Sequence, residues 1–379
     1  MASNPNSMPI SLSMHDSQIS SIDGFPNELL ERIFEEYVSD NGRIQNIARV
    51  CTRWNAIATD RPKLWSFISI DLNEVEKPSH PYRHAIAGLS IALQRSKGLA
   101  LEIRFTDAQS NTRTSYLSGA LMTCILEESH RWKLATLKID PYQGAVSVLS
   151  GRASGSAYSF DRLDSFRILE TLTITTIGCM HVQLLKRFSH TPSLSTLRVP
   201  TLGDIYSSQT VPHYDGQSFT TLKHLFLESS ADLSLVDWLA RSKDSIISCD
   251  AKRLHSFHSG GAFHPMSSDP LVLPQLVSLS LPQGYNRAID RLMLPSLKFL
   301  KLYTNTKQPF DLSRVSELIK RSACPLEKME IFAPTAIPLE NIQTTFPDML
   351  LIEVETEGSS GVRKVHLSLK SDTGDDQEH

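Results

Sequence analysis

Few residues in this sequence have types and spacing that would support chemistry. His255, His258 and His264 lie within ten residues of one another, as zinc ligands can. No nearby cysteine completes the four-ligand set that a structural zinc site needs. We therefore interpret these three as surface histidines in and after a degenerate strand, with a metal site as the alternative.

The sequence signatures of catalysis are also missing. The glycines at 151 and 155 and at 260–261 match neither of the common phosphate-binding loops. The chain contains no G-x-S-x-G nucleophile turn and no H-E-x-x-H pair. We expect no catalytic residue, no cofactor and no bound metal, so the chain is predicted not to be an enzyme.

Composition indicates an ordinary globular chain. The 379 residues are 40% apolar with a net charge of −3, which does not favour binding to nucleic acid or to a membrane surface. No apolar stretch has bilayer length and no secretory signal is visible. The five cysteines form no C-x-x-C pair, as is typical of a reducing compartment. We expect an intracellular protein of the cytoplasm, the nucleus or both.

The segment from Ile22 to Trp65 predicts three short helices. Pro26 suits the first turn of a helix, Asn41-Gly42 interrupts the chain, and Pro62 ends the last helix. One apolar stripe at helical spacing comprises Phe25, Leu29, Leu30, Ile33, Phe34, Tyr37 and Val38. A second comprises Ile44, Ile47, Val50, Cys51, Trp54 and Ile57.

These stripes carry more apolar side chains than three short helices can bury among themselves. The surplus is expected to form an exposed patch, which usually marks a surface for a protein partner. The alternative is that the surplus packs on the rest of the chain.

The same segment resembles an F-box. Its motifs stand in order as Phe25-Pro26, Glu28-Leu29-Leu30, Ile33-Phe34, Val50-Cys51-Thr52-Arg53-Trp54 and Leu64-Trp65. The resemblance implies docking on the Skp-type adaptor of a cullin–RING ubiquitin ligase. The residues it assigns to the F-box and its adaptor surface are Phe25, Pro26, Leu29, Leu30, Ile33, Phe34, Val50, Cys51, Trp54 and Trp65.

The remainder of the chain repeats the pattern L-x-x-L-x-L at intervals of 21 to 35 residues. Clear copies begin at Leu134, Leu169, Leu194, Leu222, Leu276, Leu297 and Leu326; weaker ones lie at Leu254-Phe257 and Met349-Ile352-Val354, and Leu101-Ile103-Phe105 alternates similarly. Amphipathic helical runs separate the copies at 84–95, 116–128, 181–188, 233–241 and 311–321.

A strand and a helix cannot bury their apolar edge alone, but stacked units form one continuous core. The fold class we predict is α/β, with the F-box followed by an irregular leucine-rich-repeat-like curved solenoid. Its strands would form a parallel sheet on the concave side. The alternative is an α/β domain with helices on both sheet faces. Leu93–Ser96, Ser129–Trp132 and Leu318–Ser322 resemble the expanded F-box family of mushroom-forming (basidiomycete) fungi.

The predicted organisation has five parts. Residues 1–21 form a disordered N-terminus, 22–66 the F-box, and 67–98 a connecting strand and helix. Residues 99–357 form the solenoid, and 358–379 a possible last strand and an acidic disordered tail.

Alternation within the repeats predicts the target-binding surface. The third, fifth and seventh residue of each copy point away from the core, and aromatic side chains mixed with charge favour binding. The candidates are Phe226, Phe299, Lys301, Tyr303, Lys328, Glu330 and Phe332. The alternative is that these rings pack under loops or helices.

We expect a substrate receptor of a Skp–cullin–F-box ligase, monomeric within the complex, which holds an unidentified protein target. A leucine-rich-repeat scaffold with no role in ubiquitination, capped by the three helices, is the alternative.

Overall fold

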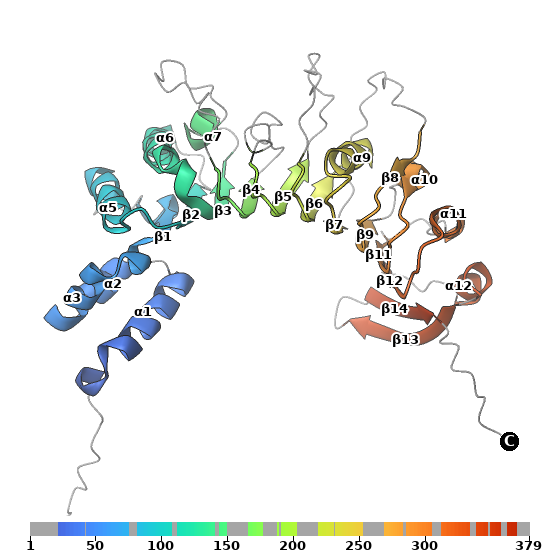
Figure 1. Ribbon diagram of the computed structural model, residues 1–379, viewed down its shortest axis with the longest axis horizontal. Helices are drawn as coiled ribbons and strands as arrows, with labels where there is room; N and C mark the ends of the chain where they lie inside the picture. The colour runs from blue at the N-terminus through green and yellow to red at the C-terminus, as the bar shows by residue number, and fades with distance from the viewer. Residues whose placement is uncertain are drawn as a thin grey trace, which may run out of the picture. The chain divides into compact units, whose positions relative to one another are not determined.

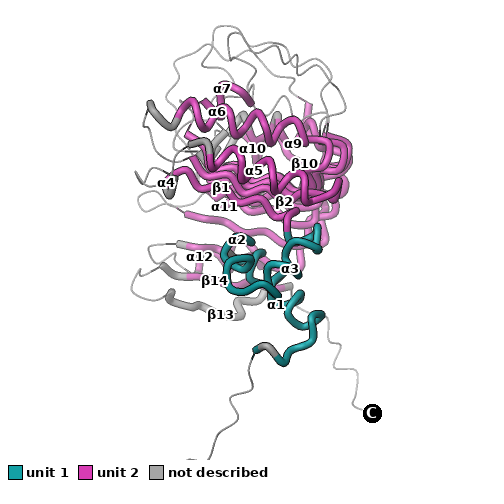
Figure 2. The backbone as a smooth tube through the Cα atoms, turned by 90° about the vertical axis from the view of Figure 1, so that its left-hand side faces the viewer, with its two compact units in different colours: residues 1–64 teal, residues 65–379 magenta. Residues whose placement is uncertain are grey.

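The computed structural model divides into two compact units, residues 1–64 and 65–379 (Figure 2). The residues it describes are 22–41, 43–75, 82–107, 112–140, 144–149, 166–176, 188, 191–202, 219–230, 232–252, 269–282, 286–304, 312–333, 339–347, 349–357 and 362–369. The predicted disordered N-terminus and acidic tail lie outside them.

The first unit consists of short helices, as the sequence predicts. They are η1 (Ile22–Gly24), α1 (Asn27–Asn41), α2 (Ile44–Ala48) and α3 (Thr52–Asp60), followed by η2 (Pro62–Trp65), which reaches the unit boundary. Helix α1 begins after Pro26, whose carbonyl accepts the first helical hydrogen bonds. Helix α3 ends before Arg61, which is extended as a residue before proline must be.

One side of α1 builds the core of the first unit. Leu30, Phe34 and Val38 recur at four-residue steps and are almost fully buried. The ring of Phe34 packs on Trp54 of α3 with 4.8 Å between centroids. Ile44, Ile47, Ile57 and Ala58 complete the core from α2 and α3.

Twelve strands of the described residues form one sheet in the second unit (Figure 1). Its strands are β1 (Phe67–Asp71), β2 (Leu101–Asp107), β3 (Trp132–Ile139), β4 (Thr171–Thr176), β5 (Thr196–Leu202), β6 (His224–Ser230), β7 (Ser248–Ala251), β9 (Ser278–Pro282), β11 (Phe299–Tyr303), β12 (Lys328–Ala333), β14 (Val362–Leu369) and β13 (Met349–Glu357). This list gives the strands in their spatial order across the sheet. From β1 to β12 the spatial order is the same as the order in the sequence. Strands β8 (Leu271–Val272) and β10 (Leu292–Met293) pair separately.

Helices lie along one side of this sheet in Figure 1. They are α5 (Tyr82–Arg95), α6 (Thr112–Glu127), α7 (Gly144–Leu149), α9 (Asp232–Arg241), α10 (Asn286–Arg291) and α11 (Leu312–Ser322). The second unit also contains the short helices α4 (Leu72–Val75) and η3 (Ser129–Arg131), and α12 (Leu339–Thr345) just before β13. Four of the five predicted helical runs are present, and the run 181–188 falls almost wholly outside the described residues.

The repeated leucines supply the core, as alternation predicts. Their fourth and sixth positions are buried in successive strands: Leu172 and Ile174, Leu197 and Val199, Leu225 and Leu227, Leu279 and Leu281, Leu300 and Leu302, Met329 and Ile331. Most intervening residues are half-buried or exposed. A mixed α/β fold with a large, mostly parallel sheet is thus shown, while its assignment as a leucine-rich solenoid stays a prediction.

The expectation of parallel strands throughout is wrong at the C-terminal end. Strand β14 pairs antiparallel with β12, and β13 pairs antiparallel with β14 at the sheet edge. Only four residues separate β13 from β14 in the chain. So short a connection allows antiparallel pairing and excludes a parallel crossover. The possible last strand is therefore β14, between β12 and the weak copy β13.

One strand of the twelve-stranded sheet was missed in the sequence, as were the short strands β8 and β10. The weak copy at Leu254-Phe257 lies outside the described residues, and β7 occupies the place between β6 and β9. Cys249 and Ala251 are buried in β7, and Ile246 is buried just before the strand. The spacing matches the repeat, but none of the three is leucine.

Candidate functional site

An apolar face of the first unit remains exposed to solvent. Phe25, Leu29 and Ile33 follow one another at four-residue steps and are 37%, 48% and 45% exposed. Ile22 and Val50 are also exposed. These five are among eleven exposed large apolar side chains in the described residues, so the face is concentrated in a small part of the chain. We call it the α1 face.

The contacts made by the other sides of α1 explain why Leu29 and Ile33 remain exposed to solvent. Leu30 and Phe34 turn toward α3 and are buried. A third side carries Glu31 and Glu35, which pair with Arg61 and with Lys63 (2.7 Å) from the segment after α3. With two sides of the helix occupied, the side of Leu29 and Ile33 is left without a partner from the described part of this unit.

The start of α3 is tied to the start of α1. The Arg53 guanidinium donates hydrogen bonds to the carbonyl of Phe25 (2.5 Å) and to Oδ1 of Asn27 (2.7 Å). The Sγ of Cys51 accepts a hydrogen bond from the Trp54 amide at 3.5 Å and caps α3. The Val50-Cys51 turn is therefore held by the helix that carries the α1 face.

The ten predicted F-box residues separate into surface and core. Phe25, Pro26, Leu29, Ile33, Val50 and Cys51 are exposed, Trp54 is half-buried, and Leu30, Phe34 and Trp65 are buried. The Arg95 guanidinium lies 4.5 Å from the centroid of the Trp65 ring, within the second unit. The sequence pattern thus mixes candidate contact residues with residues that hold the fold.

A second candidate surface lies on the open face of the sheet, away from the helices, on β11, β12 and β14. Strand pairing aligns Lys301 with Glu330 and His366, and Tyr303 with Phe332 and Lys364. Phe299 aligns with Lys328 in the same way. Six of the seven predicted target-binding residues therefore meet in one place, which we call the lysine–aromatic surface: Phe299, Lys301, Tyr303, Lys328, Glu330, Phe332, Lys364 and His366.

Glu330 is the electrostatic centre of this surface. Its carboxylate is 2.9 Å from Nζ of Lys328, 3.3 Å from Nζ of Lys301 and 3.8 Å from Nζ of Lys364. Nδ1 of His366 lies 3.4 Å away. Burial of the Glu330 carboxyl opposes ionisation, but the hydrogen bonds and charges of Lys328 and Lys301 outweigh it and lower the pKa. The group is therefore ionised at neutral pH.

The aromatic rings lie next to these charges. Tyr303 and Phe332 stack with 5.0 Å between centroids and an interplanar angle of 20°. The Lys364 ammonium is 5.5 Å from the centroid of the Phe332 ring. Sequence reasoning missed Lys364 and His366 because β14 was only a possible strand. The signal was present, since Lys364, His366 and Ser368 alternate with the buried Val365 and Leu367.

Phe226 does not join the other candidates. It lies on β6, three strands from β11, which corresponds to ~14 Å at ordinary strand spacing. The Arg198 guanidinium covers its ring at 3.9 Å. Both line a cavity of about 220 Å³ together with Asp250 and Lys252.

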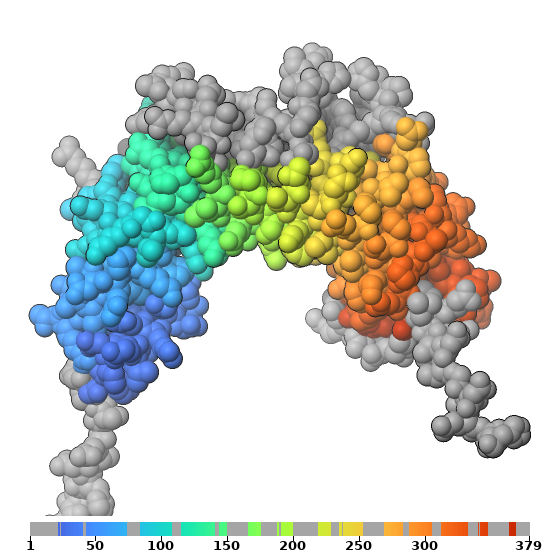
Figure 3. Space-filling model, in the orientation of Figure 1, coloured from blue at the N-terminus to red at the C-terminus, as the bar shows by residue number. Residues whose placement is uncertain are grey.

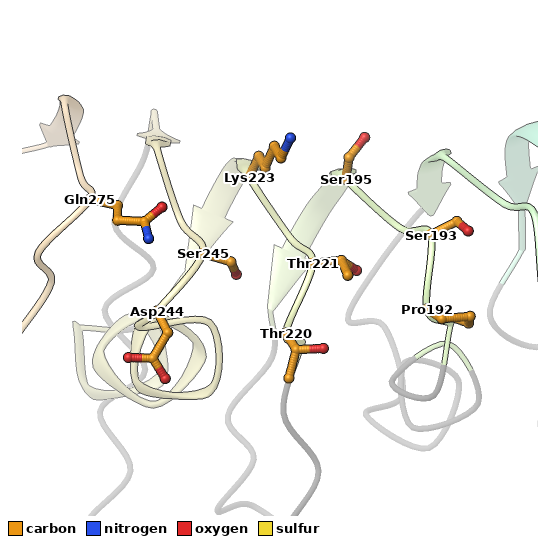
Figure 4. Close-up of a pocket in the computed structure, with 9 residues that line it drawn as sticks. All are labelled: Pro192, Ser193, Ser195, Thr220, Thr221, Lys223, Asp244, Ser245 and Gln275. Atoms are coloured by element: carbon orange, nitrogen blue, oxygen red, sulfur yellow. The ribbon is translucent and has the colours of Figure 1, made fainter.

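A larger cavity of about 390 Å³ lies where the chain enters β5, β6, β7 and β9 (Figure 4). Its hydroxyl groups join neighbouring repeats. Thr221 donates to the Leu194 carbonyl and Ser245 to the Leu222 carbonyl, while Ser193 donates to the Arg167 carbonyl. Ser296 likewise donates to the carbonyl of Pro274, which stands two residues before the first apolar position of its repeat, as Arg167 does. These four residues stand directly before the first apolar position of a repeat, so we call them the hydroxyl ladder.

The remaining observations concern groups that could carry chemistry. His255, His258 and His264 lie outside the described residues; within the described ranges, no three His, Cys, Asp or Glu side chains gather as a metal site would require. Burial, reinforced by the charge of Asp250, raises the pKa of Cys249.

In the part of the chain that the structure describes, no helix has the length and apolarity to span a membrane.

A comparison with known protein families identifies the first unit together with β1 of the second. Residues 22–71 match the family model described as F-box-like. This match includes all ten predicted F-box residues, and it confirms an F-box-like domain at this place. F-box domains generally bind a Skp-type adaptor within cullin–RING ligases. Comparison with curated proteins gives no match for the chain.

Proposed function

We propose that this protein is the substrate-recognition subunit of a Skp–cullin–F-box ubiquitin ligase. The observation that carries the proposal is the α1 face: an F-box-like domain with Phe25, Leu29 and Ile33 exposed in one line. The contact of these exposed apolar side chains with water is unfavourable and is relieved when a partner covers them. We assign the adaptor to the α1 face.

The area involved is enough to matter for binding. Complete burial of a large apolar side chain contributes about 1.5–3 kcal/mol. Phe25, Leu29, Ile33 and Val50 are between 37% and 59% exposed. Each would therefore contribute on the order of 1 kcal/mol when an adaptor covers it.

The second unit would present the target. In this proposal its strand–helix units form the leucine-rich-repeat-like solenoid, and the open face of the sheet holds the target. The subunit performs no chemistry itself, and its contribution is to position a lysine of the target near the ubiquitin-carrying enzyme. The lysine–aromatic surface supports this assignment because six of the predicted contact residues meet there.

The test is adaptor binding by the variant Leu29→Asp/Ile33→Asp. Both side chains are exposed, so thermal stability should be unchanged, while each carboxylate places a charge in the apolar contact. Adaptor affinity should fall by at least about 100-fold. Ile91→Asp is the matched control, since Ile91 of α5 is 45% exposed like Ile33 but lies outside the F-box-like domain.

Undiminished adaptor binding by the double variant, with Ile91→Asp behaving identically, would contradict the proposal. The leucine-rich scaffold would then become the better account. The scaffold account predicts that removal of residues 22–64 unfolds the sheet, because those helices would serve as its cap. If they are a docking module, the sheet should stay folded without them.

A further inference from the structure

We propose that the cavity lined by Arg198, Phe226, Asp250 and Lys252, the Phe226 cavity, binds the carboxamide side chain of a glutamine or asparagine from a partner protein. The carboxamide oxygen accepts a hydrogen bond from the Arg198 guanidinium, and its amino group donates one to the Asp250 carboxylate. The proposal rests on the proposed function only where it assigns that side chain to a degradation target. The binding itself can be measured without the adaptor.

The Asp250 carboxylate provides the first observation. Its Oδ1 atom is shielded from solvent, and within the described residues no group donates a hydrogen bond to it. A carboxylate oxygen that is withdrawn from water without a donor is unfavourable, and such atoms are rare in folded proteins. Asp250 lines the Phe226 cavity, which has a volume of about 220 Å³. The missing donor can therefore come from a group that enters this cavity.

Strand pairing places donors on the other side of the Phe226 ring. Arg198, Phe226 and Asp250 are direct neighbours in the pairing of β5, β6 and β7. The Arg198 guanidinium lies 3.9 Å from the centroid of the Phe226 ring and does not donate to Oδ1 of Asp250. Donors and an acceptor thus flank one ring without bonding to each other. A group that joins them needs one acceptor and one donor of its own.

The charges around the cavity are balanced. Four charged side chains line it, two of each sign: Arg198, Lys252, Glu228 and Asp250. The adjoining strands add no charge in the same row, because Thr173 of β4 pairs with Arg198 and Ser280 of β9 pairs with Asp250. A charged ligand would therefore meet repulsion as well as attraction. A carboxamide is neutral and carries both the acceptor and the donor that the cavity calls for.

The size of the cavity favours a side chain over a bridging water. One water occupies ~30 Å³ in the liquid, whereas the cavity measures about 220 Å³. The half-buried Phe226 ring and the half-buried Thr173 and Thr175 also line it. The methylene groups of glutamine would pack on this ring and on the threonine methyl groups, which a water cannot do. A nucleobase has a similar donor and acceptor pair, but its phosphates would approach the exposed Glu228.

The test uses the full chain and four fluorescent peptides of about eight residues, in which threonine alternates with glutamine, glutamate, lysine or leucine. Glutamate differs from glutamine only by an oxygen in place of the amino group, so this pair isolates the bond to Asp250. We expect the glutamine peptide to bind at least about fivefold more tightly than each of the others. Its affinity should change by less than about twofold with salt, because the bound group is neutral.

Asp250→Asn is the variant that tests specificity. It keeps the shape of the side chain, but its amide can donate to a carboxylate, and the cavity gains a net positive charge. The variant should bind the glutamate peptide at least as tightly as the glutamine peptide, whereas loss of a merely structural role would weaken both alike. Asp244→Asn is the control, since Asp244 is exposed in the turn before β7 and does not line this cavity. It should keep the preference for glutamine.

Arg198→Met is the second test variant. The methionine keeps an aliphatic cover on the Phe226 ring but has no donor, so the glutamine peptide should bind about 3- to 12-fold more weakly. Arg104→Met is the matched control, because Arg104 is exposed in the same row of the sheet but lies on β2, three strands from β5. Its affinity for the glutamine peptide should stay within about twofold of the parent chain. Thermal unfolding of each variant checks that it is folded.

Four outcomes would overturn the proposal. The first is a parent chain that does not bind the glutamine peptide, or binds the glutamate or lysine peptide as tightly. The second is a folded Arg198→Met or Asp250→Asn variant with the affinities of the parent. The third is tighter binding of a single-stranded oligonucleotide than of the glutamine peptide. The fourth is a gain of more than about tenfold in Gln209→Ala/Gln217→Ala, which would assign the cavity to the chain's own segment between β5 and β6. Leu29→Asp/Ile33→Asp should leave peptide binding unchanged, so a failure of adaptor docking is separable.

Discussion

At the scale of single residues, two adjacent leucines of α1 have opposite surroundings. Leu30 is completely buried, whereas Leu29 is 48% exposed. An F-box pattern names both, because a family motif records residues kept for folding and residues kept for contact alike. The structure separates them, and for this reason the test of adaptor binding uses Leu29 and Ile33. A charge at Leu30 would unfold the first unit and reveal nothing about docking.

Cysteine alkylation provides a residue-scale prediction. Cys51 is exposed and follows Val50 of the α1 face in the chain, whereas Cys249 is buried with a raised pKa. Since the thiolate is the reactive form, iodoacetamide should modify Cys51 at least ~10-fold faster than Cys249. Mass spectrometry of each cysteine-containing peptide measures both rates. A saturating adaptor should slow modification of Cys51 and leave the rate at Cys324 unchanged; equal rates at Cys51 with and without adaptor would argue against the α1 face as the contact.

Glu330 gives the chain a stability that depends on pH. Its pKa is lowered in the folded state, so the ionised group stabilises the fold above its unfolded pKa, and this contribution is lost as the pH falls through the folded value. Glu330→Gln should lower the free energy of unfolding by about 1–3 kcal/mol at pH 7 and by much less at pH 3.

Urea unfolding at the two pH values measures this difference. The groups facing Glu330 are Lys301 from β11, Lys328 from β12, and Lys364 and His366 from β14. Repeating the measurement in a His366→Asn background removes the contact between the imidazole and Glu330. A stability gap between the parent chain and the Glu330→Gln variant that widens toward pH 3 would show that the sign is wrong.

At the scale of elements, the hydroxyl ladder joins neighbouring strand–helix units of the second unit. The Thr221 hydroxyl donates to the Leu194 carbonyl at 3.1 Å and so joins the repeat of β6 to that of β5. Thr221→Val keeps the shape of the side chain but leaves this carbonyl without its donor. We expect a loss of about 0.5–1.5 kcal/mol in the free energy of unfolding.

The exposed neighbour Thr220 supplies the control. Thr220→Val should change the free energy of unfolding by less than about 0.5 kcal/mol, because it leaves the bond to Leu194 intact. Ser245→Ala should resemble Thr221→Val, since Ser245 donates to the Leu222 carbonyl at 2.9 Å. Equal stability of the Thr221 and Thr220 variants in urea unfolding would mean that these hydroxyl bonds do not hold the repeats together.

Much of the strand pattern was readable from the sequence. Wherever leucine or isoleucine stood at the fourth and sixth positions, as in β4, β6 and β11, the strand was found and its inward residues were correct. Strand β7 was missed because Cys249 and Ala251 give a weak hydrophobic signal. The direction of β13 and β14 was also missed, since a period of two is the same for parallel and antiparallel strands.

The candidate site was only partly readable. Alternation placed Lys301, Tyr303, Glu330 and Phe332 on one face, because it follows from the strand period alone. It could not show that β14 adds Lys364 and His366, which depends on a pairing between strands 30 to 40 residues apart in the chain. Nor could it show that Phe226 is three strands away from β11.

At the scale of the whole molecule, the chain combines a small helical unit with a large sheet unit. In the space-filling view the colours of the second unit follow one another from cyan to red, as expected when each repeat contacts its neighbours in the chain (Figure 3). We propose a division of labour in which the first unit docks the adaptor and the second presents the target.

The most direct test of the central claim is co-expression of the full chain with a Skp-type adaptor, followed by size-exclusion chromatography with light scattering. The account predicts a one-to-one complex, with a chain that is poorly soluble alone because the α1 face is uncovered. A chain that elutes as a stable monomer, apart from the adaptor, would contradict it and leave a protein-binding scaffold as the better description.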